Sequence, residues 1–240
     1  NRPSYIHILN KNLKNRLFTL FFHNDPLTMD GSKTIEQRKT LLKICYRIIF
    51  NSSWSKKRFL EGLESKFINS NKLLIFYQSA KKGKLSFVNN KKKWITFVGK
   101  LNRAKGYDIF AKAIKNILNK YPDWKALIIG DEKREKIFLN HKNATVMGFK
   151  KHTEVLNIFK KTSITIACSR WEEPFGRTSL EASSAGCAVI ITNRGGLPET
   201  ITNGLTIENL SEQNVYESIR KLIENKSYRK KLQKLSLKNF

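Results

Sequence analysis

The sequence predicts an α/β protein built on parallel β-sheets, and three observations support this fold class. From about residue 94 onward, short apolar runs alternate with amphipathic helical segments, which is the pattern of βαβ units. Three of the predicted strands are followed directly by a glycine, at positions 99, 130 and 148, where sharp turns are expected. Hydrophobic residues make up 40% of the 240 residues, which is enough to bury a core.

In the second half of the chain, strand and helix alternate regularly. The clearest helix covers residues 107–120, because Phe110, Ile114, Ile117 and other apolar residues recur on one face. We expect strands at 94–98, 125–129, 144–147, 163–168, 188–192 and 205–208, and further helices at 153–160, 178–185 and 211–224. This order predicts one parallel sheet that helices cover on both faces.

The first half predicts a second, smaller set of strands and helices. Residues 34–45 should form a helix that begins after Thr34, since Gln37 stands three residues later as a capping box requires. A short helix is expected from Ser53 to about residue 63. Apolar runs are expected to form strands at 5–9, 17–22, 46–50 and 72–77.

Two domains joined by a charged linker are expected. Lysines and asparagines gather at 81–84 and 89–93, which marks an exposed segment. The chain begins without Met, so that a fragment or a processed product is expected. The predicted boundaries are 1–80 for the C-terminal part of an N-terminal domain, 81–93 for the linker, 94–225 for a complete second domain and 226–240 for a helical tail.

Composition excludes several classes of protein. The 12 glycines and 5 prolines exclude a collagen-like or low-complexity chain, and no apolar run reaches the roughly 18–20 residues that span a bilayer. A net charge of +27 attracts phosphates, anionic lipids or nucleic acid. The lysines are nevertheless spread over the whole length, as an AT-rich genome produces. Cys45, Cys168 and Cys187 form no C-x-x-C motif and indicate reduced, buried thiols.

A basic loop follows the first strand of the second domain. In a parallel sheet, ligands bind beyond the carboxyl ends of the strands. The loop from Gly99 to Gly106 carries Lys100, Arg103 and Lys105 just before a helix N-terminus, which is a suitable place for phosphate. For this loop taken alone, a solvated basic turn is an equally good interpretation.

A second candidate segment follows the fourth predicted strand of that domain. Its Glu173 lies in a loop, and Glu181, eight residues later, lies within the next helix. Gly176 opens this helix, so that the free amides of Arg177 and Thr178 can hold a diphosphate, whereas carboxylates suit sugar hydroxyls. A structural role for the glutamates, as helix-dipole partners, leaves the Pro-Phe-Gly sequence beside Glu173 unexplained.

Together these segments resemble the family-4 retaining glycosyltransferases of the GT-B fold. The resemblance rests on the two glutamates at 173 and 181, on Glu-Ala-Ser-Ser-Ala-Gly at 181–186, on the Gly-Lys-Leu start of the loop at 99–106, and on Gly-Gly-Leu-Pro-Glu at 195–199. It covers residues 94–225 well and 18–80 more loosely. It implies a Rossmann-like nucleotide-sugar-binding domain, preceded by the truncated remainder of a second Rossmann-like domain that would bind the acceptor.

The resemblance implies a role for each matching residue. His23 and Glu173 would be catalytic and face the transferred sugar. Lys100 and Lys105 would hold the donor diphosphate, and Glu181 would bind the ribose hydroxyls. Lys100 stands where the family usually has arginine, which keeps the charge but loses the bidentate fork. The donor-binding set would comprise Gly99, Lys100, Lys105, Gly148, Phe149, Phe175, Gly176, Arg177, Thr178 and Glu181.

The implied reaction moves a hexosyl group from a nucleotide diphosphate sugar to an acceptor, with retention of anomeric configuration. The chain has no Asp-x-Asp motif, so we expect no metal and no cofactor besides the nucleotide sugar as co-substrate. Fixed cations and helix amides would stabilise the departing diphosphate instead. No carboxylate is an obvious nucleophile, which favours a front-face mechanism over double displacement.

Three alternatives remain open: a GT-B nucleotide-sugar epimerase, a basic nucleic-acid-binding module, and an inactive fragment that only binds the donor. A nucleic-acid interface needs cations and aromatic residues on one face, whereas the aromatic residues here fall mostly in strands and helix cores. The donor base, the sugar and the acceptor are not identified, although a lipid-linked or envelope glycan suits the family. The expected location is the cytoplasm, with the basic cluster at 56–58 compatible with contact to an anionic membrane on its cytoplasmic face.

Overall fold

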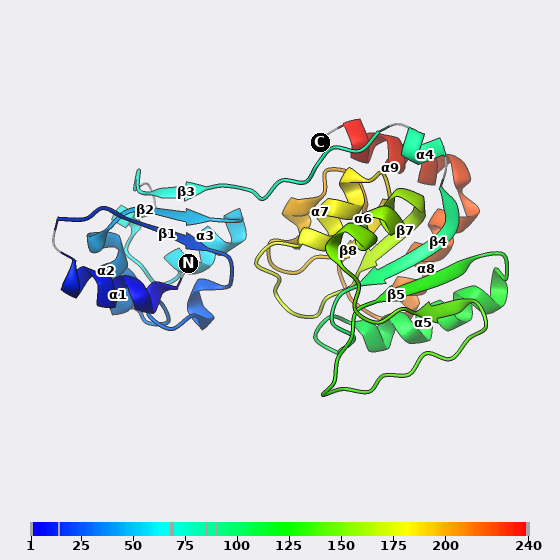
Figure 1. Ribbon diagram of the computed structural model, residues 1–240, viewed down its shortest axis with the longest axis horizontal. Coiled ribbons are helices and arrows are strands. Elements are labelled where there is room, and N and C mark those ends of the chain that lie inside the picture. The colour runs from blue at the N-terminus through cyan, green and yellow to red at the C-terminus, as the bar shows by residue number, and fades with distance from the viewer. Residues whose placement is uncertain (1, 14, 68–69, 85, 90, 239–240) are drawn as a thin grey trace. The chain divides into compact units, whose positions relative to one another are not determined.

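The computed structural model describes residues 2–13, 15–67, 70–84, 86–89 and 91–238 (Figure 1). The chain divides into two compact units. Unit 1 comprises Asn1–Gln78 with Glu173–Phe175, and unit 2 comprises Ser79–Glu172 with Gly176–Phe240. Both units are built on parallel β-sheets with helices packed against them, which confirms the predicted α/β class.

Unit 1 is built on a three-stranded parallel sheet with the order β1-β2-β3. The rings of Phe22, Phe50 and Phe59 pack against one another at centroid distances of 5.3–5.5 Å and form the centre of its core. The elements are β1 (Phe18–Phe22), β2 (Cys45–Phe50), β3 (Leu73–Ile75), α1 (Pro3–Asn12), α2 (Ile35–Ile44), α3 (Ser53–Leu60), and the 3-10 turns η1 (Pro26–Thr28) and η2 (Ser65–Phe67).

Of two predictions for the helical parts of unit 1, one is confirmed and one is wrong. The capping box of α2 is present, because the Gln37 N–H donates to Thr34 Oγ1 at 3.2 Å and Gln37 Oε1 accepts from the Thr34 N–H at 3.3 Å. The strand predicted at 5–9 is instead part of α1. Pro3 suits the first position of a helix, and Pro3 and Ile6, three residues apart, are the buried residues of one helical face.

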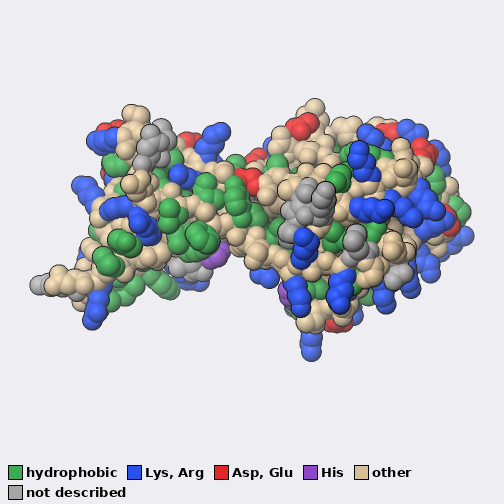
Figure 2. All heavy atoms as spheres, turned by 90° about the horizontal axis from the view of Figure 1, so that it is seen from above, with side chains coloured by type: hydrophobic (Ala, Val, Ile, Leu, Met, Phe, Trp, Pro, Cys, Tyr) green, Lys and Arg blue, Asp and Glu red, His purple; other side chains and the backbone are tan. Residues whose placement is uncertain are grey.

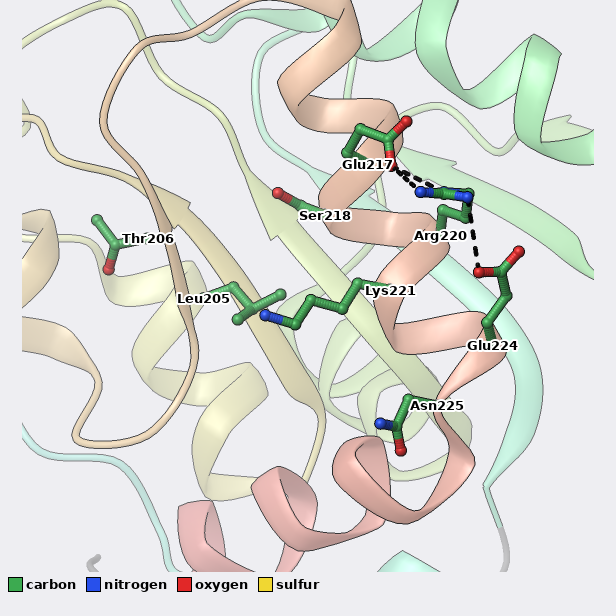
Figure 3. A pocket seen from close by; sticks show the side chains of 8 residues that line it. All are labelled: Leu205, Thr206, Glu217, Ser218, Arg220, Lys221, Glu224 and Asn225. Atoms are coloured by element: carbon green, nitrogen blue, oxygen red, sulfur yellow. Dashed lines mark hydrogen bonds and ion pairs between the residues drawn. The ribbon is translucent and has the colours of Figure 1, made fainter.

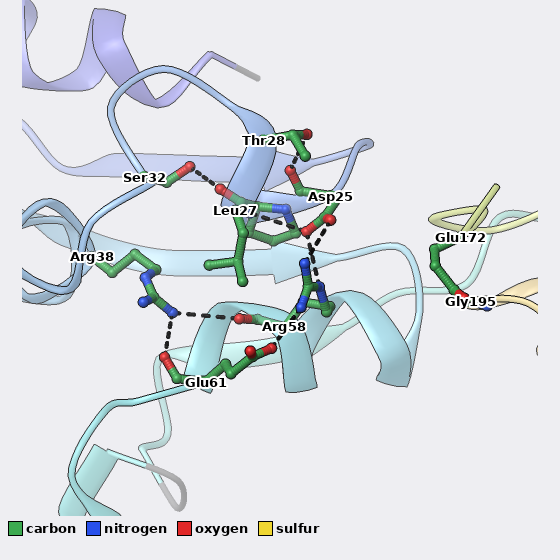
Figure 4. A network of polar contacts seen from close by, with 10 residues as sticks. Asp25, Leu27, Thr28, Ser32, Arg38, Arg58, Glu61, Glu172 and Gly195 are labelled. Carbon is green, nitrogen blue, oxygen red and sulfur yellow. Dashed lines mark hydrogen bonds and ion pairs between the residues drawn. The ribbon is translucent and has the colours of Figure 1, made fainter.

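Two arginines tie α2 and the loop before η1 to α3 (Figure 4). The buried Arg38 donates to the carbonyls of Phe59 and Glu61 at 2.6 and 2.8 Å, near the end of that helix. Arg58 donates to both carboxylate oxygens of the buried Asp25, at 3.3 and 3.1 Å. Arg58 belongs to the basic cluster at 56–58, and its charge is therefore engaged within unit 1.

Unit 2 is built on a six-stranded parallel sheet with the order β6-β5-β4-β7-β8-β9. Every strand and helix predicted after residue 93 is present, with bounds within about two residues of the prediction. The strands are β4 (Lys92–Val98), β5 (Lys125–Ile129), β6 (Ala144–Val146), β7 (Thr162–Ala167), β8 (Ala188–Thr192) and β9 (Leu205–Ile207). The helices are α4 (Ser86–Asn89), α5 (Tyr107–Lys120), α6 (His152–Lys161), α7 (Arg177–Ser184), α8 (Glu212–Glu224) and α9 (Lys226–Lys238), with the 3-10 turn η3 (Leu197–Thr200).

Helices cover both faces of this sheet, as the alternation of strand and helix predicts (Figure 1). One hydrophobic core joins the sheet to α5 and α8 through residues such as Phe97, Ile114 and Ile219. A second core joins the other face to α6 and α7 and includes Phe159 and Val189. Burial on both faces accounts for the nearly continuous apolar sequence of β8.

The lysine-rich stretch before β4 is held against unit 2. The Gly83 N–H donates to the Ser184 carbonyl at the end of α7, at 2.8 Å. Lys91 Nζ donates to the carbonyls of Phe159 and Ala185, both at 2.8 Å, near the C-terminal ends of α6 and α7. Burial lowers the pKa of the Lys91 ammonium below its ordinary value. One lysine that the sequence assigns to an exposed linker is therefore an internal contact of this unit.

The surface of the chain carries a large excess of basic side chains, as the net charge of +27 requires. Figure 2 shows Lys and Arg side chains scattered over the face in view, in agreement with their even spread along the sequence. Within the residues that the structure describes, none of the helices combines the length and the apolar character that a membrane crossing requires.

Candidate functional site

The sheet of unit 2 brings both candidate segments to one place. From β4 the sheet extends through β5 and β6 on one side, and through β7, β8 and β9 on the other. The loop at 99–106 follows β4, and the segment at 168–177 follows β7. In open α/β sheets, ligands bind beyond the carboxyl ends of the strands at this kind of topological switch point. The two segments singled out in the sequence thus flank the position that the topology favours.

Backbone contacts hold these two loops together. The Ala104 carbonyl accepts from the N–H groups of Arg170 and Trp171, at 2.9 and 3.1 Å. Gly106 has φ +71°, and a Cβ atom added there would lie 1.9 Å from the Cys168 carbonyl oxygen. Only glycine fits this position, because both its conformation and the space around it exclude a side chain.

Lys105 is positioned by the loop and by an aromatic ring. Its N–H donates to Oδ1 of the buried Asn102 at 3.0 Å, and its Nζ lies 5.0 Å from the centroid of the Trp171 ring. A predicted phosphate-binding cation is therefore held at the switch point. Trp171 was not among the predicted site residues. It could have been found as an aromatic side chain within a predicted ligand-binding loop.

Arg170 ties the two loops to the start of α5 and is neutralised there. Its guanidinium donates to both carboxylate oxygens of Asp108, at 2.6 and 2.8 Å, and to the Arg103 carbonyl at 2.6 Å. Burial alone would raise the pKa of Asp108, but the bonds from Arg170 lower it below its ordinary value. Because this charge is matched, we do not count Arg170 among the candidate phosphate-binding cations.

Three predicted glycines lie at the ends of neighbouring strands. The Gly130 N–H donates to the Gly148 carbonyl at 2.9 Å, and the Gly99 N–H donates to the Ile129 carbonyl at 3.0 Å. Gly148 has φ +66°, and a Cβ added there would meet no atom within 4 Å, so the space above it is open. Phe149 follows with 77% of its surface exposed. An exposed ring beside open backbone is a suitable surface for a flat nucleobase.

Lys100 lies at a small pocket at the ends of β4 and β5. The pocket has a volume of about 380 Å³, and Asp131, Glu132, Lys133 and Arg134 also line it. Hydrogen bonds from Arg134 lower the pKa of Glu132 to about 2. The adjacent acidic residues Asp131 and Glu132 are thus partly engaged by an arginine.

A larger pocket, of about 460 Å³, lies between β9 and α8 (Figure 3). Three of its four charged groups pair among themselves, because Arg220 contacts the carboxylates of Glu217 and Glu224 at 2.6 and 3.8 Å. It lies at the far edge of the sheet from β6 and away from the switch point between β4 and β7. We therefore do not assign it to the candidate site.

The N-terminus of α7 follows the loop after β7. Gly176 precedes the helix, and its carbonyl accepts from the Ser179 hydroxyl at 2.7 Å and from the Leu180 N–H at 3.1 Å. The amides of Arg177 and Thr178 belong to the first turn, where no preceding helical carbonyl can accept from them. This helix end thus offers the free N–H groups that the sequence predicted for a diphosphate.

Glu181 is a buried carboxylate with two donors on the same oxygen. Its side chain is 9% exposed, and Oε1 accepts from Arg177 Nε at 2.6 Å and from His152 Nε2 at 2.9 Å. Arg177 lies one turn earlier on α7, whereas His152 is the first residue of α6. The sequence analysis missed His152, since it stands 29 residues from Glu181 and nothing in the local pattern joins them.

Glu172 links the loop after β7 to the loop after β8. Its Oε2 accepts from the Gly195 N–H at 2.5 Å (Figure 4), and Oε1 accepts from Arg194 at 3.2 Å. The Thr192 hydroxyl donates to the Ser169 carbonyl between the same two strand ends, at 2.7 Å. The Gly-Gly-Leu-Pro-Glu segment noted in the sequence therefore lies against the candidate loop.

His23, one of the two predicted catalytic residues, belongs to unit 1. It follows β1, and its ring stacks on that of Phe21 with the centroids 4.4 Å apart. Partial burial lowers the pKa of His23 below its ordinary value, which favours the neutral ring near neutral pH. Its carbonyl accepts from the Asn51 side chain at 3.3 Å.

Glu173 and Phe175 are grouped with unit 1, whereas Glu172 and Gly176 on either side are grouped with unit 2. Within unit 1, the carbonyl of Pro174 between them accepts from the Ser52 hydroxyl at 2.6 Å. The Phe175 ring lies 6.3 Å from that of Tyr77. The predicted site residues are therefore divided, with His23, Glu173 and Phe175 in unit 1 and the remainder in unit 2.

The cysteines and carboxylates do not form a redox or metal centre in the described part of the chain. All three cysteines are buried and free, and burial raises the pKa of Cys45 to about 11 and that of Cys168 to about 12. Among the residues that the structure describes, no three His, Cys, Asp or Glu side chains are gathered as a metal site would need. These thiols act as small core residues, as the sequence predicts.

Comparison with known proteins now identifies the class that this fold and this arrangement of loops define. Residues 79–238 match the family described as "Glycosyl transferases group 1", and the chain belongs to this family. Spore coat protein SA of Bacillus subtilis is 25% identical over 98% of this chain and 71% of its own length. A glycosyltransferase of Methanocaldococcus jannaschii described as uncharacterized is 30% identical over 78% of this chain and 52% of its own length.

Solved structures agree on the fold. The crystal structure of Anabaena HepE in complex with UDP matches 99% of this chain and 71% of that chain, with a TM-score of 0.81 at 16% identity. This likeness confirms the predicted GT-B fold. The chain thus spans between half and about seven-tenths of the length of these proteins.

Proposed function

We propose that this chain is the donor-binding part, with a portion of the acceptor-binding part, of a retaining glycosyltransferase that uses a nucleotide diphosphate sugar. The single observation that carries this proposal is the arrangement at the switch point of unit 2. Cations on the loop after β4 stand beside the free helix N-terminus after β7, and Glu181 lies within that helix. Phosphate needs the first two features, and ribose hydroxyls suit the third.

The donor would be bound through three of its parts. Lys100, Lys105 and the amides of Arg177 and Thr178 would hold the diphosphate, whose charge grows as the glycosidic bond breaks. Gly148 and Phe149 would lie beside the base, and Glu181 would bind the ribose. Gly99, which ends β4, would allow the phosphate to approach the backbone.

Transfer of the sugar would depend on His23 and Glu173, with the amides at Phe175 and Gly176 beside the sugar. These roles follow from the family resemblance, as do retention of configuration and the front-face mechanism. A neutral His23, which its lowered pKa favours, could accept a hydrogen bond from a sugar hydroxyl. We assign no metal to the reaction, since the fixed positive groups already supply the electrostatic stabilisation that a metal would give.

The acceptor is proposed to be a glycan or a lipid-linked precursor of the cell envelope. The resemblance to envelope glycosyltransferases suggests it, and a relative named as a spore coat protein is compatible with it. We propose that the protein works in the cytoplasm. UDP is the first nucleotide to test, because it is bound in the HepE structure.

Two substitutions test the division of roles between the glutamates. Glu181→Ala should weaken binding of UDP, because a ribose contact is present in both ground and transition states. Glu173→Gln should instead lower turnover while leaving UDP binding within about twofold, since its contact would strengthen as charge develops.

Binding would be measured by calorimetry on this chain, and turnover on the full-length protein with a panel of nucleotide sugars and envelope acceptors. NMR of the product would report the anomeric configuration. Inverted product would contradict retention, and unchanged turnover in Glu173→Gln would contradict the role of that residue. Altered free nucleotide sugar, formed without an acceptor, would point to an epimerase instead.

A further inference from the structure

The Glu181 carboxylate is held by hydrogen bonds from two helices, and the inference drawn from these bonds depends on the proposed function. Oε1 of Glu181 accepts two hydrogen bonds, one from each of two helices. Among the described residues, no side chain or backbone group donates to Oε2. The carboxylate therefore has one occupied oxygen and one that can accept from a ligand.

The two donors come from different helices. Arg177 belongs to the first turn of α7, the helix that also carries Glu181, and its side chain is 63% exposed, whereas that of His152 is 54% exposed. His152 stands at the first position of α6, where the Lys151 N–H donates to the Glu154 carboxylate at 2.9 Å and fixes the start of the helix. Val155 of the same helix is buried in the core. His152 therefore approaches Glu181 from a different and well-anchored element.

We propose that His152 is a positioning residue for nucleotide recognition, which holds the Glu181 carboxylate so that Oε2 is presented to the ribose hydroxyls. Without this bond, the Glu181 carboxylate can rotate about the last bond of its side chain. Binding of a ribose then includes the entropy loss of orienting the carboxylate, which weakens the affinity. The other donor, Arg177, belongs to the same helix as Glu181. Its hydrogen bond therefore does not fix the carboxylate relative to α6. Removal of His152 should thus weaken only ligands that use the ribose hydroxyls.

The experiment compares two ligands that differ only in those hydroxyls. Calorimetry would give the affinities of UDP and 2′,3′-dideoxy-UDP for the wild-type chain and for His152→Ala. GDP and its dideoxy analogue form a second pair. We expect His152→Ala to lower the UDP affinity by roughly three- to tenfold and to leave the dideoxy affinity within about twofold.

Two further variants make the test specific. His152→Gln keeps a side-chain N–H that can donate to Oε1 and should restore part of the UDP affinity. His141→Ala removes a histidine of the same unit that contacts Asn119 at 3.1 Å, and it should change neither affinity. Melting temperatures of all variants would be measured without ligand, to show that unit 2 remains folded.

The outcomes separate the inference from the function on which it rests. An equal loss for both ligands, or no loss for UDP, would overturn the positioning role while leaving the donor site in place. Wild-type protein that binds neither UDP nor GDP would overturn the proposed function and this inference with it. Selective loss with rescue by glutamine would establish His152 as part of nucleotide recognition.

Discussion

At the scale of single residues, the surroundings of a lysine decide what it can contribute. Lys105 lies over the Trp171 ring at the switch point, Lys91 is half-buried between two helix ends, and Lys93 forms an exposed ion pair with Asp123. The sequence does not reveal that these three lysines have different surroundings, because each belongs to a basic stretch. Of the three, Lys105 alone belongs to the proposed phosphate-binding loop at 99–106.

Lys105→Ala should weaken UDP binding more than Lys93→Ala does. The loss of a charged hydrogen-bond donor to phosphate is expected to cost about 1.5–3 kcal/mol. Both substitutions remove one positive charge, so Lys93→Ala controls for the general attraction of a basic protein. Calorimetry at one salt concentration measures the difference, and equal affinities would contradict the assignment of the loop to the diphosphate.

At the scale of elements, the close approach of two loops depends on one glycine. Gly106 caps α5 in the left-handed conformation and lies against the Cys168 carbonyl. Any side chain there must push apart the loops after β4 and β7, which are the two that carry the proposed diphosphate site. Gly148 has a similar φ but open space around it, so it offers a matched comparison.

Gly106→Ala is expected to destabilise unit 2 more than Gly148→Ala does. In both variants, an alanine in the left-handed conformation lowers the free energy of unfolding by about 1–2 kcal/mol. Only Gly106→Ala also creates a clash with the backbone. Urea unfolding followed by tryptophan fluorescence would compare them, because Trp94, Trp124 and Trp171 all lie in unit 2. Equal destabilisation would mean that the loops move apart at no cost.

The elements themselves were largely predictable where pattern and burial agree. Helix α5 was predicted to the residue, because its apolar positions repeat with helical spacing and the core uses that face. Helix α1 was misread as a strand, because Tyr5, Ile8 and Leu9 make an apolar run although they lie exposed. Run length alone does not reveal which residues a fold will bury.

At the scale of the whole molecule, the order of the strands along the chain does not reveal their order in the sheet. The alternation of strands and helices predicts a parallel sheet, but nothing local places β7 beside β4. The two candidate loops nevertheless follow neighbouring strands, and they lie together because every strand of a parallel sheet ends at the same edge. Contacts between loops, such as His152 with Glu181, depend on that strand order and were missed.

Binding of UDP by this chain, and turnover by the full-length protein, should not require a divalent metal. A metal clamp on diphosphate needs gathered oxygen ligands, and none of the acidic side chains in the described residues form such a group. Excess chelator should therefore leave both measurements within about twofold, and added magnesium or manganese should change them little. Loss of turnover in chelator that one of these metals restores would contradict the metal-free assignment.

The place of β4 in the sheet also has a consequence for synthesis of the chain on the ribosome. β4 is the first strand of unit 2 to be made, but it lies inside the sheet between β5 and β7. β5 follows closely, whereas β7 emerges only after about 60 further residues, which takes several seconds at roughly 5–20 residues per second. Until then, the backbone N–H and C=O groups along one edge of β4 have no partner strand. The nascent chain should therefore need protection from aggregation most strongly between the release of β5 and that of β7.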